Sequence, residues 1–218
     1  MVQERCANAD VKIALIDYDA GNLASVQNAL AGMGAAFVRV AEPEALRSGG
    51  FSHVILPGVG AFGAAMNGLK KNAMDRALVR AVGEGMPLLG ICLGMQLLFE
   101  RSQESPGVAG LCLLEGECVA IPRLSGLKIP HMGWNTLDVA GNPPGFCDLP
   151  QNPAFYFVHT YHVVPQNAEI ITATAAYGQP LCAMIARGKL WGAQCHPEKS
   201  GKVGLAWLQQ FLDCTASY

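Results

Sequence analysis

The sequence predicts an α/β protein, with a doubly wound, largely parallel open sheet and flanking helices. Three observations support this fold class. Short apolar strands alternate with helical patterns through the first half of the chain, as in parallel sheets covered on both faces. The second half carries closely spaced strand patterns separated by Gly, Pro and Asn, which predict an additional antiparallel β portion. The 218 residues are 51% hydrophobic and 15% charged, which suits a sizeable core and excludes disorder.

The first half opens with a buried strand at residues 11–18 and a turn at Asp19-Ala20-Gly21. Apolar residues at helical spacing then run from Asn22 to Met33, and Gly34 stands where a helix typically ends. Strands and helices keep alternating after this point. The strands are Phe37–Val40, His53–Leu56 and Pro87–Ile91; one or two helices span Ala64–Val82, and another spans Gly94–Arg101.

The second half is dominated by strand patterns, and Gly188 between the last two predicts a hairpin turn. A final helix spans about Lys202–Asp213. Because no linker or repeat separates the halves, we expect residues 11–218 to form a single domain after a frayed extension at residues 1–10. The strands are Cys112–Ile121, Thr136–Val139, Phe155–Val164, Ile170–Ala176, Leu181–Ala186 and Lys189–Gln194.

Composition excludes several classes of function. A net charge of -2 with few charged residues leaves no clustered basic face for nucleic acid. The longest apolar stretch, Pro87–Phe99, is shorter than the ~20 residues of a membrane span, and residues 1–10 lack the apolar region of a secretory signal. The eight cysteines contain no C-x-x-C pair, which favours reduced thiols in a cytoplasmic protein.

The strongest candidate for chemistry is Gly90-Ile91-Cys92-Leu93-Gly94, which follows an apolar strand and opens a helix. The same spacing with serine forms the nucleophile elbow, a strained turn that lifts the nucleophile out of the sheet. N–H groups and the positive dipole at a helix start favour a thiolate. A lone cysteine is more often an inert buried thiol, but the paired glycines favour Cys92 as a nucleophile.

The motif His196-Pro197-Glu198 suggests a base with an orienting carboxylate. Pro197 favours an extended backbone at His196, and residues two apart in an extended chain face the same side. Glu198 can then orient the imidazole, as in a nucleophile–base–orienter triad. Alone the motif also suits a surface loop. Together with Cys92 it predicts a Cys-His-Glu triad.

The turn Pro57-Gly58-Val59-Gly60 follows a strand, at the carboxyl edge of the sheet where open α/β folds bind ligands. Its glycines free a peptide to point an N–H into the site, where the Leu93 N–H would complete an oxyanion hole. An ordinary glycine turn explains the motif equally well. The oxyanion hole is therefore a hypothesis at this point.

The remaining candidates are interpreted as structural. His159 and His162 lie three apart on one predicted strand, so they face opposite sides and do not form a metal site. His53 begins a strand, and Met66 and Met74 lie in helical patterns. We expect a structural role for His53 and core positions for the two methionines.

Together these motifs resemble class I (triad-type) glutamine amidotransferases, which have a flavodoxin-like fold, and more narrowly the glutaminase subunits of imidazole glycerol phosphate synthases. The triad motifs indicate the broad class. The segments His-Met-Gly-Trp-Asn, Phe-Val-His and Pro-Glu-Lys-Ser narrow the resemblance to the glutaminase subunits. The matching stretches follow the family order through nearly the whole chain: Asp17–Leu23, Leu56–Gly63, Leu89–Leu98, Pro130–Asn135, Tyr156–Tyr161 and Gln194–Gly201.

Two segments depart from the family pattern. The first turn reads Asp-Ala-Gly-Asn where the family has Gly-Met-Gly-Asn. Cys195 stands where phenylalanine is usual, which predicts a second thiol beside the catalytic centre and greater sensitivity to oxidation. Neither departure changes the expected reaction.

The resemblance implies a role for each motif. Cys92 attacks the side-chain amide of L-glutamine and forms a glutamyl thioester, His196 transfers protons and Glu198 orients His196. No metal or organic cofactor is implied. The implied substrate-binding residues are Gly58, Gly60 and Leu93 at the oxyanion, Gln96, Glu104 at the α-ammonium, and the Thr160 and Tyr161 backbone at the α-carboxylate.

The resemblance also implies a partner, a (β/α)₈ barrel cyclase subunit that uses the ammonia to make imidazole glycerol phosphate and AICAR in histidine biosynthesis. The chain itself lacks a Walker loop and a dinucleotide fingerprint. The alternatives are a paralogous amidotransferase pair, a peptidase or γ-glutamyl hydrolase, and a non-catalytic scaffold, the last of which the intact triad disfavours. The implied interface residues are Asn22, Trp134, Asn135, Tyr156 and Lys199.

Overall fold

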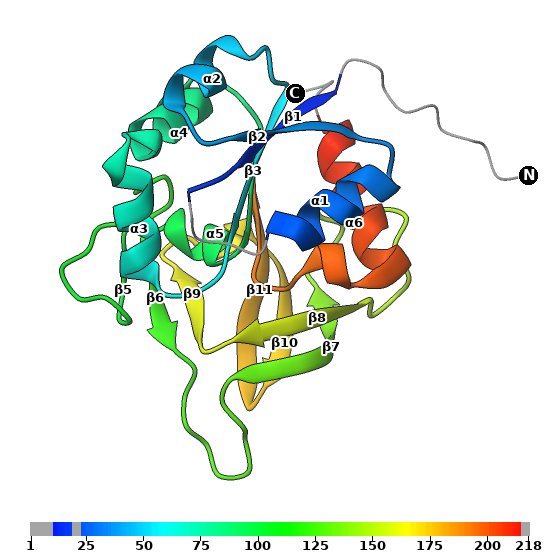
Figure 1. Ribbon diagram of the computed structural model, residues 1–218. Helices are drawn as coiled ribbons and strands as arrows, with labels where there is room; N and C mark the ends of the chain where they lie inside the picture. The colour runs from blue at the N-terminus through cyan, green and yellow to red at the C-terminus, as the bar shows by residue number, and fades with distance from the viewer. Residues whose placement is uncertain (1–10, 19–22, 215–218) are drawn as a thin grey trace, which may run out of the picture.

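The computed structural model describes residues 11–18 and 23–214 (Figure 1). The expected extension at residues 1–10 and the implied interface residue Asn22 lie outside the described residues. A nine-stranded sheet with the order β2-β1-β3-β4-β12-β11-β10-β7-β8 forms the centre. From β2 to β12 the neighbours are parallel, and they are β1 (Lys12–Ile16), β2 (Ala36–Val40), β3 (His53–Gly58), β4 (Leu88–Cys92) and β12 (Leu190–Ala193).

The remaining strands are mostly antiparallel, as the second half of the sequence predicts. They continue the central sheet through β11 (Gln179–Arg187), β10 (Ile171–Tyr177), β7 (His131–Val139) and β8 (Ala154–His159). A separate three-stranded sheet holds β5 (Arg101–Ser102), β6 (Gly116–Ala120) and β9 (Tyr161–Pro165). The predicted fold class is therefore confirmed, including its antiparallel portion and the hairpin around Gly188.

Helices cover both faces of the parallel strands (Figure 1). One face packs against α1 (Leu23–Gly32) and α6 (Gly201–Asp213), and the core there includes Trp191, Trp207 and Phe211. The other face packs against α2 (Pro43–Ser48), α3 (Phe62–Lys71), α4 (Met74–Gly83) and α5 (Leu93–Leu97). Met66 and Met74 are fully buried in this second core, as expected.

The predicted helix over Gly94–Arg101 is wrong at its C-terminal end. Helix α5 ends at Leu97, and Arg101 already belongs to β5. The cause is a loop that returns to this segment, because Leu111 N donates to Leu97 O at 2.8 Å and Leu113 N donates to Leu98 O at 2.9 Å. Periodicity along the chain carries no signal for such a tertiary hydrogen bond.

Two predicted strands are also wrong in extent. The segment Phe155–Val164 is two strands, because β8 and β9 join different sheets on either side of Thr160. The segment Cys112–Ile121 keeps only β6, and Cys112 has a φ of 52°, outside the range of a strand. The first correction places the boundary between two strands beside the predicted substrate-binding backbone.

His53 is a buried histidine whose ionisation opposes folding. Its side chain is 0% exposed at the start of β3, and burial lowers its pKa to about 4. As the pH falls below about 6.5, His53 therefore takes up a proton in the unfolded chain but stays neutral in the folded chain. The stability that comes from neutral His53 is complete above pH 6.5 and is lost as the pH falls toward 4.

We expect the variant His53→Leu to lose less stability on acidification than the wild type. Urea unfolding at pH 7.0 and at pH 4.5 measures this, with an expected reduction of about 2 kcal/mol in the difference between the two pH values. Equal acid sensitivity of the two proteins would show that His53 does not contribute.

Candidate active site

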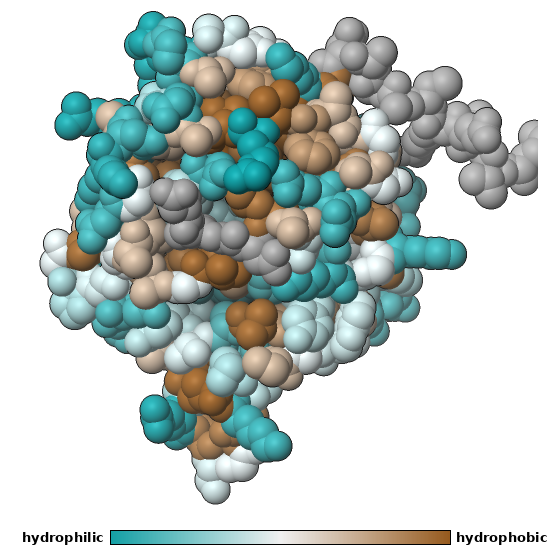
Figure 2. Space-filling view, in the orientation of Figure 1, coloured by the Kyte–Doolittle hydropathy of each residue, from teal (hydrophilic) through white to brown (hydrophobic). Residues whose placement is uncertain are grey.

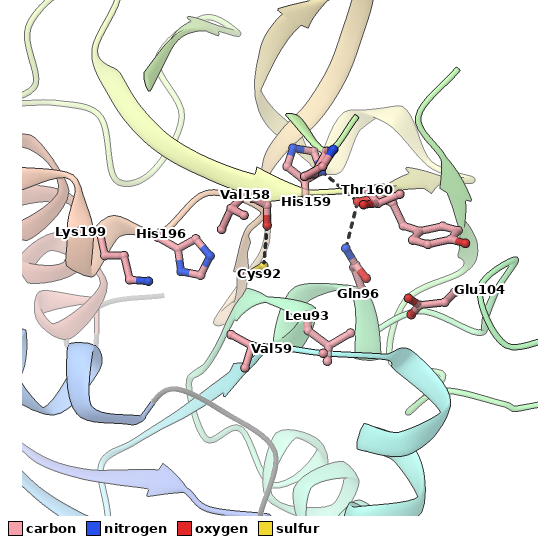
Figure 3. A pocket seen from close by; sticks show the side chains of 13 residues that line it. Val59, Cys92, Leu93, Gln96, Glu104, Val158, His159, Thr160, His196 and Lys199 are labelled. Carbon is pink, nitrogen blue, oxygen red and sulfur yellow. Dashed lines mark hydrogen bonds between the residues drawn. The ribbon is translucent and has the colours of Figure 1, made fainter. Parts of the chain in front are cut away.

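A pocket of about 370 Å³ lies at the carboxyl ends of the parallel strands (Figure 3), the edge of open α/β sheets where ligands bind. The loop after β3, the β4–α5 turn, the junction between β8 and β9, and the segment after β12 supply its walls. The lining residues are Val59, Gly60, Cys92, Leu93, Gln96, Glu104, Pro130, Val158, His159, Thr160, Tyr161, His196 and Lys199.

Cys92 sits on a strained turn between β4 and α5, with φ 55° and ψ −110°. The flanking glycines are needed because neighbouring backbone approaches them closely. A Cβ at Gly90 would lie 2.6 Å from Gly94 O, and one at Gly94 would lie 1.8 Å from Leu56 O. The turn has the features expected of a nucleophile elbow, and Cys92 lines the pocket.

His196 and Glu198 form a buried pair beside Cys92. His196 Nδ1 lies 2.8 Å from Glu198 Oε1, and the side chains are 4% and 3% exposed. The expected contact is present, but the chain does not continue extended from His196 to Glu198 as expected, because Pro197–Lys199 form a 3-10 turn. The turn is closed by Lys199 N, which donates to His196 O at 3.0 Å. The carboxylate therefore reaches the imidazole by folding back.

The electrostatics of the pair favour a protonated imidazole. Burial alone would lower the pKa of His196, but the nearby Cys92 sulfur and the hydrogen-bonded carboxylate of Glu198, with the negative charges of these two groups, raise it to about 9. In Figure 3 the imidazole points from the side of Lys199 toward Cys92. The arrangement can thus exchange a proton with the sulfur while Glu198 stabilises the positive charge.

The predicted oxyanion residues are brought together in part. Gly60 and Leu93 line the pocket with Cys92, and Gly60 has a φ of 95°, a conformation that favours glycine. Gly58 is buried at the end of β3 and is absent from the lining of this pocket. A Cβ at Gly58 would lie 2.5 Å from Tyr18 Oη, so this glycine provides packing space.

The predicted substrate-binding side chains line the opposite wall. Gln96 Nε2 donates to Tyr161 O and to Gln194 Oε1, each at 3.0 Å. Glu104 Oε2 accepts a hydrogen bond from Phe62 N at 2.6 Å, at the first residue of α3. Glu104 is thus held by the helix that follows the Val59–Gly60 turn.

Sequence reasoning missed Gln194 as a functional candidate. It is 0% exposed, and its Nε2 lies 3.8 Å from Cys92 Sγ while its Oε1 accepts from Gln96. Gln194 therefore connects Cys92 to the side chain of Gln96. The position two residues before His196 was its only sequence signal.

The expectation that Cys195 adds an oxidation-sensitive thiol is not supported by its surroundings. The side chain is 0% exposed within the core next to α6, and burial raises its pKa well above that of a free thiol. Oxidation requires an accessible thiolate. Cys195 is a core residue that happens to precede His196.

Three of the predicted interface side chains gather beside the pocket. Trp134 on β7 is 61% exposed, and its ring lies edge-to-face with Tyr156 on β8, at 6.2 Å between centroids. Lys199 is exposed and lines the pocket. Asn135 points inward instead, because its Nδ2 donates to Ala176 O at 2.9 Å. The projecting loop between β6 and β7 also exposes apolar side chains, as Figure 2 shows.

Three further findings concern residues 11–18 and 23–214 only. None of their helices is both long and apolar enough to cross a membrane. No three of their His, Cys, Asp and Glu side chains come close enough together to hold a metal ion. Their seven cysteines form no disulfide.

Comparisons with known proteins agree with this geometry. The family described as "Glutamine amidotransferase class-I" matches residues 14–214. The imidazole glycerol phosphate synthase subunit HisH of Moorella thermoacetica is 45% identical over 199 residues, 91% of this chain and 93% of that protein. The subunit HisH of Streptococcus gordonii is 48% identical over 200 residues, 91% of this chain and 94% of that protein.

Solved structures show the same fold at low sequence identity. A glutamine amidotransferase structure superposes with a TM-score of 0.71 at 20% identity, covering 94% of this chain and 99% of that one. A structure of PurLQS from Thermotoga maritima gives 0.70 at 18% identity, covering 93% of this chain and 98% of that one. The chain therefore belongs to the class-I glutamine amidotransferases and, within them, to the family of the imidazole glycerol phosphate synthase subunit HisH.

Proposed function

We propose that this chain is the glutaminase subunit of an imidazole glycerol phosphate synthase and that Cys92, His196 and Glu198 carry the reaction. One observation carries the proposal: a buried His–Glu pair stands beside a cysteine on a nucleophile elbow, inside a pocket at the carboxyl edge of the sheet. Family membership supplies the substrate class. The pocket volume of about 370 Å³ suits a small molecule such as glutamine.

The reaction begins when the Cys92 sulfur attacks the side-chain amide carbon of glutamine. A C–S bond forms, the amide oxygen becomes an oxyanion, and His196 donates its proton to the nitrogen. The C–N bond then breaks, which releases ammonia and leaves a glutamyl thioester. Water, deprotonated by His196, attacks the thioester, so that glutamate leaves and the Cys92 thiolate returns.

The walls of the pocket suit the charges of an amino acid. Glu104 is the carboxylate available for the α-ammonium, and the backbone at Thr160 and Tyr161 is available for the α-carboxylate. Both charges need partners because they leave water on binding. The N–H groups near Gly60 and Leu93 are available for the developing oxyanion once the Gly60 peptide is in its competent orientation.

We place a (β/α)₈ cyclase on the face that carries Trp134 and Tyr156. Aromatic anchors beside a charged side chain are typical of interface centres, and here Lys199 is the charged neighbour at the rim of the pocket. Ammonia released at Cys92 would pass directly to such a partner. We further propose that residues 11–218 act as one amidotransferase domain and that the pair works in the cytoplasm, where its free thiols stay reduced.

Mixing the purified chain with the cyclase barrel tests this proposal. We expect the two to co-elute in gel filtration, and we expect glutamate formation to rise by roughly 10² to 10³ when the cyclase holds its ligand, the range that one oxyanion donor supplies. The reason is the Gly60 turn, whose glycine peptide changes orientation easily and settles in the competent state on docking.

An unrelated (β/α)₈ barrel of similar size serves as the control and should not activate the chain. Equal glutaminase rates for the chain alone and for the pair would argue against activation by the partner. A pair that ignores glutamine altogether would argue against the proposed function.

A further inference from the structure

Two buried histidines lie side by side at the pocket wall, and the proposed triad uses neither. His131 on β7 and His159 on β8 are opposite each other in the strand register. Their side chains are 3% and 6% exposed, and His131 Nδ1 lies 2.9 Å from His159 Nε2. His159 also lines the pocket, and its other ring nitrogen, Nδ1, lies 2.9 Å from Tyr161 O.

The hydrogen bonds of this pair run in one direction. A carbonyl oxygen only accepts, so His159 Nδ1 carries the hydrogen that binds Tyr161 O. Burial lowers the pKa of His159 to about 3 and that of His131 to about 4, so both rings are neutral at pH 7. His159 Nε2 then accepts from His131 Nδ1, and His131 Nε2 accepts from Asn135 Nδ2 at 3.2 Å.

The Tyr161 carbonyl, which accepts the last of these hydrogen bonds, belongs to the backbone that faces the pocket. Ile121 N donates to Thr160 O at 2.9 Å, which makes Ala120 and Tyr161 a non-hydrogen-bonded pair of the β6–β9 ladder. The N–H and C=O of Tyr161 therefore both point away from β6. On that side Gln96 Nε2 donates to Tyr161 O, and Figure 3 draws this bond as the dashed line from Gln96.

Packing fixes the outer ring of the pair. His131 is stacked between Phe157, at 4.7 Å between ring centroids and 23° between planes, and Tyr177, at 4.1 Å and 29°. A ring held on both faces cannot swing away from His159. The orientation of His159, and through it the direction of the Tyr161 carbonyl, is fixed from the core side of the strand.

We propose that His159, held by His131, is a positioning residue that aims the Tyr161 backbone N–H at the α-carboxylate of glutamine. The inference rests on the proposed function. The Tyr161 N–H belongs to the Thr160–Tyr161 peptide, which Ile121 N holds on β6 through Thr160 O. Two side-chain donors, His159 and Gln96, hold the next peptide through the Tyr161 carbonyl, so the backbone is held on both sides of the Tyr161 Cα. Correct aim lowers the KM for glutamine and leaves later chemistry unchanged.

The test measures KM and kcat for glutamine, and the rate with ammonia in place of glutamine, in the assembled complex with the cyclase. For His159→Ala we expect KM to rise roughly tenfold, as for the loss of one orienting hydrogen bond. The kcat and the ammonia-dependent rate should stay within about twofold. His159→Asn restores a donor at the position of Nδ1, so its KM should lie within about threefold of wild type.

His162 provides the matched control. It is a second buried histidine on β9, its Nδ1 lies 3.2 Å from Val163 O, and it is absent from the pocket lining. His162→Ala should lower the melting temperature without raising KM. His131→Phe, which keeps the stacking on Phe157 and Tyr177, tests the pair if His159→Ala does not fold, with an expected rise in KM of roughly threefold.

An unchanged KM in both His159→Ala and His131→Phe would overturn the inference. So would a His159→Asn variant as impaired as His159→Ala, or an equal rise in KM for His162→Ala. A wild-type complex that does not use glutamine would instead overturn the proposed function, which is a separate outcome of the same assay.

Discussion

The Cys92→Ala variant is expected to lose glutamine-dependent synthesis by a factor of roughly 10⁴ or more, the size seen when a nucleophile is removed from a triad. Ammonia-dependent synthesis by the complex should stay at the wild-type rate, because the cyclase then needs nothing from this pocket. The fold should persist, since alanine fits the same turn and Cys92 Sγ makes only long contacts, 4.0 Å to Val158 O and 3.8 Å to Gln194 Nε2. Paired assays with glutamine and with ammonium salt measure both rates.

Cys195→Ala is the matched control. Cys195 lies three positions before Glu198, but its thiol faces the core. We expect it to keep glutamine-dependent activity and to lose about 1 kcal/mol of stability, as for a small core truncation. If glutamine use survives in Cys92→Ala, or disappears in Cys195→Ala, the nucleophile would have to be reassigned to Cys195.

The sequence predicts those parts of the fold and site that depend on local pattern. The parallel strands are continuous apolar runs, so their positions and the helices between them follow from periodicity. The elbow at Cys92 is predictable because only glycine fits at the two flanking positions, where neighbouring backbone approaches closely. His196 and Glu198 are two positions apart, so a local motif was enough to predict their contact, although the 3-10 turn that makes it was not predicted.

The parts that could not be predicted depend on contacts between distant segments. The end of α5 is set by hydrogen bonds from Leu111 and Leu113, and the break at Thr160 arises because β8 and β9 find partners in different sheets. The same holds in the site. Gln194 and the pair of His131 with His159 are defined by hydrogen bonds to side chains 28 to 102 positions away in the sequence. No local motif therefore indicates their roles.

His196 and Glu198 should differ in their effects when each is replaced. His196→Ala removes the proton carrier, and we expect a loss of roughly 10⁴ or more in glutamine-dependent kcat. Glu198→Gln keeps the shape of the side chain and an oxygen for His196 Nδ1, so the loss should be smaller, roughly 10² to 10³. Steady-state glutaminase assays in the complex measure both. Equal losses in two folded variants would mean that Glu198 does more than orient the ring.

The pH dependence separates the two explanations for the loss in Glu198→Gln. The charge of Glu198 helps to raise the pKa of His196 to about 9, and removing that charge lowers this pKa. His196 must be protonated to deliver a proton to the leaving ammonia, so the alkaline limb of the rate profile should move to lower pH. Stability follows the same sign: the wild type loses the contribution of the ion pair as the pH rises from 6.5 through 9, whereas Glu198→Gln should be flatter there. A variant with lower activity but an unmoved alkaline limb would mean that Glu198 acts through the position of His196 and not through its charge.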